Sequence, residues 1–422
     1  MSVLWYTQSV FNFIDAAMPN HAASATFRIL FCALLATAIG QSVMLTTLPS
    51  MGREAGLSEF HIAIIMSSSA FIFALGTSVW SKVAKRAGFK RILMVGLFGY
   101  SMGTFFFASA WQMGFSGLIT GTSLFLALLV SRSMQSTIMS ATPPSAVGYA
   151  IAISTQQERV SAISKVTSAS NVGQIVGPAY AGLLVGFGLL TPLYSIVILT
   201  IAALVVVWLK LPAIAPAAAA ENKITLSNKP VHHSIVPLLL VASCAGVFCA
   251  MAMMQQTLGF FFIDFYGKTT VEAAQQVGTA MMVSAAASLG VQLLLVQRAR
   301  FSPEKMIKIA LPLLAVAYML MYTHQQIATL YIAMFCMGTG MGMAYPSLTA
   351  TATSYCSEEK QASVTGLITA TPAMGYVVGP PVAAMLYQTD INSPFLAASI
   401  LMAAFAILVT VTLINTNKKA KE

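Results

Sequence analysis

One arginine lies where a charge is unexpected, inside an apolar stretch of the chain. Arg132 falls within residues 120–142, which are otherwise suited to crossing a lipid bilayer. A charge at that depth costs about 2.5–3.5 kcal/mol on insertion scales, so the side chain normally faces a cavity or a partner. Two interpretations follow: Arg132 handles a substrate or a proton, or it is a structural clamp on neighbouring carbonyls.

A few further polar side chains in apolar segments could act on a ligand. Gln41 and Gln256 fall at corresponding places under an offset near 215 residues, and Gln255 is adjacent. Asp264 is the nearest acidic candidate for carrying protons, because no Asp or Glu falls at the centre of an apolar segment. Apolar surroundings would favour its neutral form, whereas a wet position at the outer mouth would leave it an ordinary carboxylate.

The composition is that of a chain embedded in a membrane, so apolar segments must position these residues. Of 422 residues, 57% are hydrophobic and only 8% are charged, whereas a soluble domain carries about 25% charged residues. The five cysteines lack paired spacing and are expected to be buried thiols. The sequence contains no H-E-x-x-H or G-x-S-x-G motif and no paired intramembrane carboxylates, so we expect no metal, no cofactor and no enzyme activity.

A membrane-spanning helix needs about 20 mostly apolar residues, and the chain offers twelve such segments. They are residues 26–50, 58–81, 92–111, 120–142, 161–187, 191–209, 235–262, 272–296, 306–322, 328–351, 362–387 and 394–415. The predicted fold is therefore an all-α membrane protein of two six-helix bundles. The expected parts are an N-terminal cytoplasmic segment (1–25), a first bundle (26–211), a linker (212–234), a second bundle (235–416) and a tail (417–422).

Lysine and arginine orient these spans, because cytoplasmic loops are enriched in both. With both termini cytoplasmic, every basic residue except Arg53, Lys268 and Arg132 lies on the cytoplasmic side. This distribution predicts a multi-pass protein of a cytoplasmic (inner) membrane. The bilayer accounts for the net charge of +10, so a nucleic-acid partner is not needed. The pair His232 and His233 in the linker is expected to be solvated rather than a metal site.

The two halves repeat one another. An offset of 202 residues maps Pro144 onto Pro346, and it maps the stretch GQIVGPAYAG at 173–182 onto GYVVGPPVAA at 375–384. Two parallel half-repeats with a site between them near the midplane are one plan for a transporter.

The repeated stretch places small residues four apart on one helical face. Such a face lets another helix approach closely, and a proline inside the helix bends it. The stretch therefore either supports a moving element or serves as static packing. Its residues are Gly173, Gly177, Pro178 and Gly182 in the first half, and Gly375, Gly379 and Pro380 in the second.

These motifs make the chain resemble the major facilitator superfamily over essentially its whole length. Residues 164–182 are similar to the G-x8-G-x3-G-P-x2-G-G signature of drug:proton antiporters, with Ser164 and Ala181 in place of glycines. RSMQS is similar to the family's R-x-x-Q-G motif, at Arg132 and Gln135. The resemblance implies an exporter that exchanges its cargo for protons.

The loop SKVAKRAGFKR resembles the family's cytoplasmic G-x-x-x-D-R-x-G-R-K loop. Arg86, Gly88, Lys90 and Arg91 match that pattern, but Lys85 replaces its aspartate. The loop either still latches the two halves, by pairing with Glu158 or with Glu358 and Glu359, or it only sets the topology.

The function predicted from these features is alternating-access export of a small amphiphilic compound by a monomer in the lipid bilayer. A proton-coupled solute uptake symporter is the alternative. The cargo would be a drug-like molecule or a secreted metabolite such as a siderophore. A membrane-embedded enzyme or receptor is the remote alternative. Methionines near Met253 and Met337 either line an adaptable cavity or pack the core.

Overall fold

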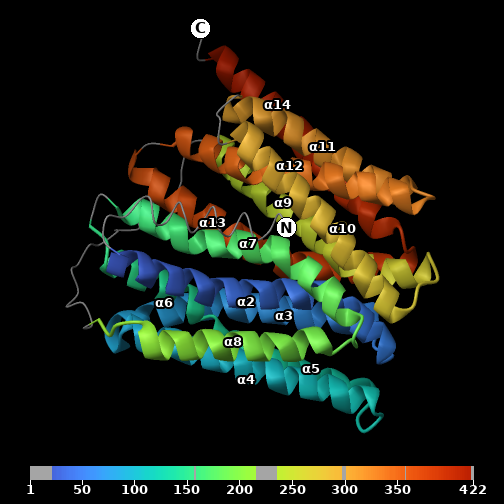
Figure 1. Ribbon diagram of the computed structural model, residues 1–422. Coiled ribbons are helices and arrows are strands. Elements are labelled where there is room, and N and C mark those ends of the chain that lie inside the picture. Colours follow the sequence, from blue (N-terminus) through green and yellow to red (C-terminus); the bar gives the residue numbers. More distant parts are fainter. Residues whose placement is uncertain (1–20, 156–157, 215–234, 297–300, 357, 420–422) are drawn as a thin grey trace. The chain divides into compact units, whose positions relative to one another are not determined.

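The computed structural model describes residues 21–155, 158–214, 235–296, 301–356 and 358–419, and these form helices joined by short connections (Figure 1). In the first half the helices are α2 (His21–Glu54), α3 (Glu59–Ala87), α4 (Phe89–Phe115), α5 (Gly121–Met139), α6 (Thr142–Ala152), α7 (Arg159–Val185) and α8 (Thr191–Lys210). In the second half they are α9 (Ile235–Asp264), α10 (Thr270–Val291), η1 (Gln292–Val296), α11 (Pro303–Thr323), α12 (Ile327–Ser354), α13 (Glu358–Thr389) and α14 (Ser393–Lys419). Most of the predicted linker and the histidine pair lie outside the described residues.

Each of the twelve predicted spans falls on helical structure. Within the described residues, eleven helical stretches are long and apolar enough to cross a membrane, and one of them joins α5 and α6 as Gly121–Ala152. The one predicted span that is missing from these eleven is residues 161–187, which corresponds to α7, a helix of 27 residues. Its serines, Asn171, Gln174 and Lys165 lower its apolar character, so its length predicts a span better than its composition does.

The turn between α3 and α4 depends on one glycine. Gly88 has a φ of +95°, a conformation that side chains with a Cβ rarely adopt. It separates α3, which ends at Ala87, from α4, which begins at Phe89. A single residue therefore reverses the chain and places Lys90 and Arg91 in the first turn of α4.

The contacts divide the chain into two compact units. The first comprises residues 1–57, 68–221 and 270–278, and the second comprises residues 58–67, 222–269 and 279–422. In the first unit α2 packs against α7 and α8, and α4 packs against α5, α6 and α8. Figure 1 shows α4, α5 and α8 running side by side.

In the second unit α9 packs against α12, α13 and α14, and α11 packs against α12 and α14. The C-terminal end of α9 is closely packed: Phe260, Phe261 and Phe262 are fully buried. The methionines follow the same pattern, because Met253, Met334 and Met337 are buried too. This burial favours packing for these three side chains.

The structure describes all five cysteines as free thiols. The expected burial is confirmed for Cys244, whereas Cys249, Cys336 and Cys356 are half-buried and Cys32 is exposed. Its place in an apolar helix predicted burial, but an apolar helix of a membrane protein also has an apolar outer surface, so an apolar segment does not by itself bury a side chain.

Candidate functional site

Arg132 is the centre of a buried polar cluster in the first unit. Its side chain is only 8% exposed, and α5 directs it toward α2. One terminal nitrogen, Nη2, donates a hydrogen bond to Gln41 Oε1 at 2.7 Å, and the other, Nη1, donates to Gln135 Oε1. The structure therefore brings together three of the predicted site residues, from two helices that are far apart in the sequence.

Gln135 links this cluster to α4. Its Nε2 donates a hydrogen bond to Thr104 Oγ1 at 2.6 Å, so both ends of its amide are engaged. Gly103 permits the approach of the two helices, because a Cβ at that position would lie 2.5 Å from Gln135 Cβ. Gly103 thus lets α5 lie close enough to α4 for the Gln135 amide to bond to Thr104.

The cluster is electrostatically unusual because both recorded partners of Arg132 are neutral amides. Gln41 in turn donates to Met139 Sδ at 3.8 Å, again a neutral group. Tyr100 is fully buried nearby, and its hydroxyl has no hydrogen-bond partner within the described structure. A guanidinium has five N–H donors, so two bonds leave donors for a further acceptor.

The second unit arranges its polar residues differently. Gln255 is buried, and its Oε1 accepts a hydrogen bond from the Tyr376 hydroxyl at 2.5 Å. Gln256 donates from Nε2 to the backbone oxygen of Glu59 at 3.1 Å. These hydrogen bonds of the two amides therefore stay within the second unit.

Asp264 lies at the end of α9, and its side chain is exposed. Its Oδ2 accepts a hydrogen bond from the Tyr387 hydroxyl at 2.8 Å. The preceding phenylalanines are buried, but the carboxylate itself is not enclosed by them. This placement supports the wet alternative over an apolar proton site.

The repeated glycines form a close seam in each unit. A Cβ at Gly173 would lie 2.9 Å from Ala38 C and Ile39 N on α2. A Cβ at Gly375 would lie 2.6 Å from Phe248 C and 2.7 Å from Cys249 N on α9. Both glycines therefore pack against helix backbone, and only a residue without a Cβ fits.

The second glycine of each pair repeats the arrangement one turn later. A Cβ at Gly177 would lie 3.0 Å from Ile39 O, and one at Gly379 would lie 2.8 Å from Cys249 O. Ile39 on α2 therefore corresponds to Cys249 on α9. With the same offset, Gln41 corresponds to Met251. The correspondence of Gln41 with Gln256 expected from sequence is wrong, because the helix contacts set a different register.

The remaining residues of the first stretch pack against α10, because a Cβ at Gly278 would lie 2.6 Å from Pro178 O and 3.1 Å from Gly182 Cα. A Cβ at Gly182 would come no nearer than 3.5 Å to Gln275 O, in a segment of the same unit. Pro178 and Pro380 both lie inside helices, in α7 and α13. A side chain at Gly182 itself would thus have more room than one at Gly173 or Gly177, although the backbone of this segment lies close to Gly278.

The basic loop is engaged within the first unit. Lys90 Nζ donates to the backbone oxygen of Trp208 on α8 at 2.9 Å, while Arg86 and Arg91 are exposed. Glu158 accepts a hydrogen bond from Thr155 Oγ1 at 2.8 Å. The side chains of Glu358 and Glu359 lie outside those described, so a latch through them stays a prediction.

Sequence reasoning missed the partners that hold the predicted residues. They are Thr104, Met139, Tyr376 and Tyr387. A tyrosine within an apolar span was the available signal, because a buried phenol usually seeks a hydrogen-bond partner. Thr104 and Met139 carry no such signal, since both residue types are common in apolar helices.

Known proteins resemble this chain along most of its length. A family model described as Major Facilitator Superfamily matches residues 30–371 and 273–422. Multidrug resistance protein 2 of Bacillus subtilis (strain 168) is 22% identical over 389 residues, which cover 89% of this chain and 92% of that protein. Multidrug resistance protein 1 of the same organism is 22% identical over 388 residues, covering 90% and 94%.

Two solved structures have a similar fold. The nucleoside transporter NupG superposes with a TM-score of 0.72 at 15% identity, covering 92% of this chain and 99% of that one. A bacterial homolog of the human lysosomal transporter Spinster, inward-facing and occupied, gives a TM-score of 0.68 at 13% identity, with 94% and 96% covered.

Proposed function

This chain belongs to the Major Facilitator Superfamily, and on that premise we propose that it exports a small amphiphilic compound in exchange for protons. Family membership makes it a multi-pass membrane transporter of small molecules. The export direction is supported by the glycine–proline stretch at 173–182 and by the names of the two multidrug resistance relatives.

The buried Arg132 is the observation that carries the proposal. A buried cation without a charged partner is destabilising unless another group compensates it. Its two hydrogen-bond partners supply neutral amide oxygens. We infer that an acidic or strongly accepting group of the cargo completes the site, while an apolar part of the same cargo contacts the surrounding hydrophobic side chains.

The proposed setting is a cytoplasmic membrane with both termini on the cytoplasmic side and a monomer as the transporting unit. Alternating access moves the cargo outward, and an inward flow of protons drives it. Asp264 is the proton-carrying candidate from the sequence, although its exposure gives it little support in that role.

Transport in everted membrane vesicles tests this proposal. Because the cytoplasmic face points outward in such vesicles, an exporter that exchanges protons accumulates cargo when the vesicle interior is acid. The panel would contain fluorescent amphiphilic dyes and iron chelators, each with an acidic, a neutral and a basic member. We expect acidic members to accumulate, and the ionophore nigericin to abolish the accumulation.

Arg132→Ala should lower this transport by roughly ten- to a hundredfold, the value of hydrogen bonds made by a charged group. Lys305→Gln is the matched control, because it removes a positive charge from an exposed position on α11. Accumulation that ignores the proton gradient would contradict antiport. Uptake confined to right-side-out vesicles would instead establish the alternative, a proton-coupled symporter.

A further inference from the structure

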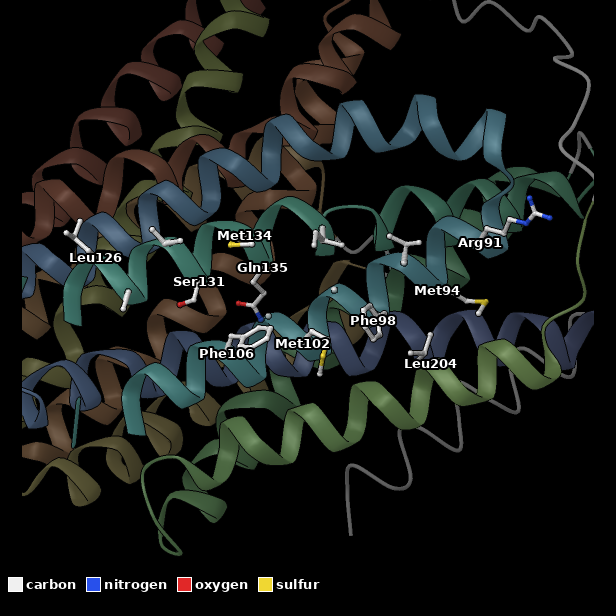
Figure 2. A pocket seen from close by; sticks show the side chains of 16 residues that line it. Arg91, Met94, Phe98, Met102, Phe106, Leu126, Ser131, Met134, Gln135 and Leu204 are labelled. Carbon is white, nitrogen blue, oxygen red and sulfur yellow. The ribbon is translucent and has the colours of Figure 1, made fainter. Parts of the chain in front are cut away.

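An open groove runs along the first unit between α4, α5 and α8. Its volume is about 910 Å³, and we call it the outer groove (Figure 2). Its walls include Phe98, Met102, Phe106, Val130, Met134 and Leu204. Several of these side chains are largely exposed, among them Met134 at 63% and Phe106 at 60%. The groove is therefore an apolar surface that lipid can reach.

The polar groups in the middle of the outer groove are already engaged. Gln135 lies in its floor (Figure 2), but its amide bonds to Arg132 and Thr104. Ser131 Oγ donates to the backbone oxygen of Leu128 at 3.1 Å. The middle of the groove thus has little to offer a polar ligand, and a hydrocarbon chain suits it better.

One end of the outer groove is cationic. Figure 2 shows Arg91 and Leu126 at opposite ends. A second pocket of about 390 Å³ adjoins the Arg91 end, and we call it the head pocket. It shares Arg91 and Met94 with the groove and adds Lys90, Gly88 and Ile214. Two cationic side chains, Lys90 and Arg91, therefore lie at the end of the apolar outer groove.

The dimensions match one leaflet of a bilayer. From Arg91 to Met102 the helix rises about 16 Å, both residues lining the groove. The hydrocarbon core of a bilayer is about 30 Å thick, so one leaflet contributes about 15 Å. With Arg91 at the level of the lipid headgroups, an acyl chain in the groove would reach the midplane near Met102.

We propose that the outer groove and the head pocket together bind one phospholipid with an anionic headgroup. The phosphate lies against Lys90 and Arg91, and one acyl chain follows the groove between α4 and α5. The charge of the head pocket selects an anionic over a zwitterionic headgroup, because each basic residue near a membrane surface attracts anionic lipid. Gln135 borders both this site and the Arg132 cluster, but the proposed lipid contacts are those of Lys90, Arg91 and the apolar walls, so the proposal does not depend on the direction of transport.

Native mass spectrometry of the purified full chain tests this site. Phosphatidylglycerol and phosphatidylethanolamine with identical acyl chains would be titrated in parallel. We expect one tightly bound phosphatidylglycerol per chain, and affinity for it at least tenfold higher than for phosphatidylethanolamine. Inorganic phosphate should not displace the lipid, because the acyl chain supplies part of the binding.

Four variants locate the lipid. Lys90→Gln combined with Arg91→Gln should weaken phosphatidylglycerol binding at least tenfold, given about 1 kcal/mol for each basic residue. Lys85→Gln with Arg86→Gln removes two charges from the same loop outside the pockets and should leave binding unchanged. Val130→Trp fills the groove and should also abolish tight binding, whereas Ile198→Trp, exposed on α8 outside the groove, should not.

Arg91→Gln alone keeps Lys90 and its bond to Trp208, so lipid binding can still be measured if the double variant does not fold. Equal phosphatidylglycerol affinity in the parent and in both the Arg91→Gln and Val130→Trp variants would overturn the site. A lack of preference between the two lipids would overturn the role of the head pocket. Displacement of the lipid by a transported dye would assign the groove to cargo instead.

Discussion

The seam between α2 and α7 and the seam between α9 and α13 are built alike, yet the chemistry beside them differs. In both, two glycines four residues apart lie against the backbone of the partner helix. At the 202-residue offset of the repeat, however, Arg132 and Gln135 correspond to Met334 and Met337. Both methionines are fully buried.

The repeat therefore preserves how the helices approach each other and not which side chains lie beside the seam. Close backbone approach requires the absence of a side chain, so any substitution of a seam glycine disturbs packing. A polar cluster makes no such demand on the scaffold. One unit can keep a charged cluster while the other fills the same positions with adaptable methionine, which gives a symmetric frame an asymmetric interior.

Breaking a seam should have the largest effect. Gly173→Leu and Gly375→Leu should each destabilise the protein by more than about 3 kcal/mol, the upper range for overpacking, because the neighbours are backbone atoms that cannot move aside. We expect little monodisperse protein by size-exclusion chromatography. Gly366→Leu is the control, since no atom lies within 4 Å of its added Cβ; equal losses there would contradict the seam.

The second prediction makes the first unit resemble the second. Arg132→Met with Gln135→Met should lower transport on the order of a hundredfold, because the charge and its hydrogen bonds are lost together. The melting temperature should stay the same or rise, since a buried charge has been removed. Met334→Leu with Met337→Leu is the control and should retain transport. Undiminished transport in the Arg132 variant would remove this cluster from the site.

Sequence reasoning found the frame of this molecule because packing leaves a periodic record. Apolar runs of span length predict the helices, and the spacing of Gly173 and Gly177 predicts a close contact. Arg132 is also visible, since a charge in an apolar span is rare. These features depend on the residue alone or on its neighbours along one helix.

The partners of Arg132 could be predicted only in part, because the cluster also includes residues on other helices. Gln135 is one turn away on the same helix, but Gln41 and Thr104 lie on α2 and α4. Their contacts depend on the register between helices, which no single-helix pattern specifies. The same limitation explains the mistaken pairing of Gln41 with Gln256, where loop lengths shifted the apparent offset.

A third prediction sharpens that corrected register. Gln41→Leu should lower transport roughly tenfold, because Arg132 loses one hydrogen bond made by a charged group. Gln256→Leu should have a smaller effect, since its amide bonds to the backbone of Glu59 instead. Transport by both variants would be measured in the same vesicles at matched protein levels. Equal losses would restore the sequence-based equivalence of the two glutamines.

The smallest predicted effect concerns His324, which follows the last residue of α11 in the second unit. It is buried against Phe261, Phe265 and Tyr266, and Nε2 has no hydrogen-bond partner within the described structure. Burial lowers the pKa of His324 below its ordinary value, and a bond between Nδ1 and Met321 O opposes this shift only in part.

The sign of the pH effect follows from that lowered pKa. As pH falls below about 6.5, the unfolded chain binds a proton that the folded chain does not yet accept. Stability from this group is thus present above that pH and is lost as the medium becomes acidic. We expect the melting temperature to fall by a few degrees at most between pH 7.5 and 5.5, and the fall to be smaller in His324→Phe. Arg132→Met is the control, because the buried arginine of the first unit stays charged throughout this pH range. This variant should leave the pH dependence unchanged. A changed pH dependence in Arg132→Met and an unchanged one in His324→Phe would place the acid sensitivity in the first unit.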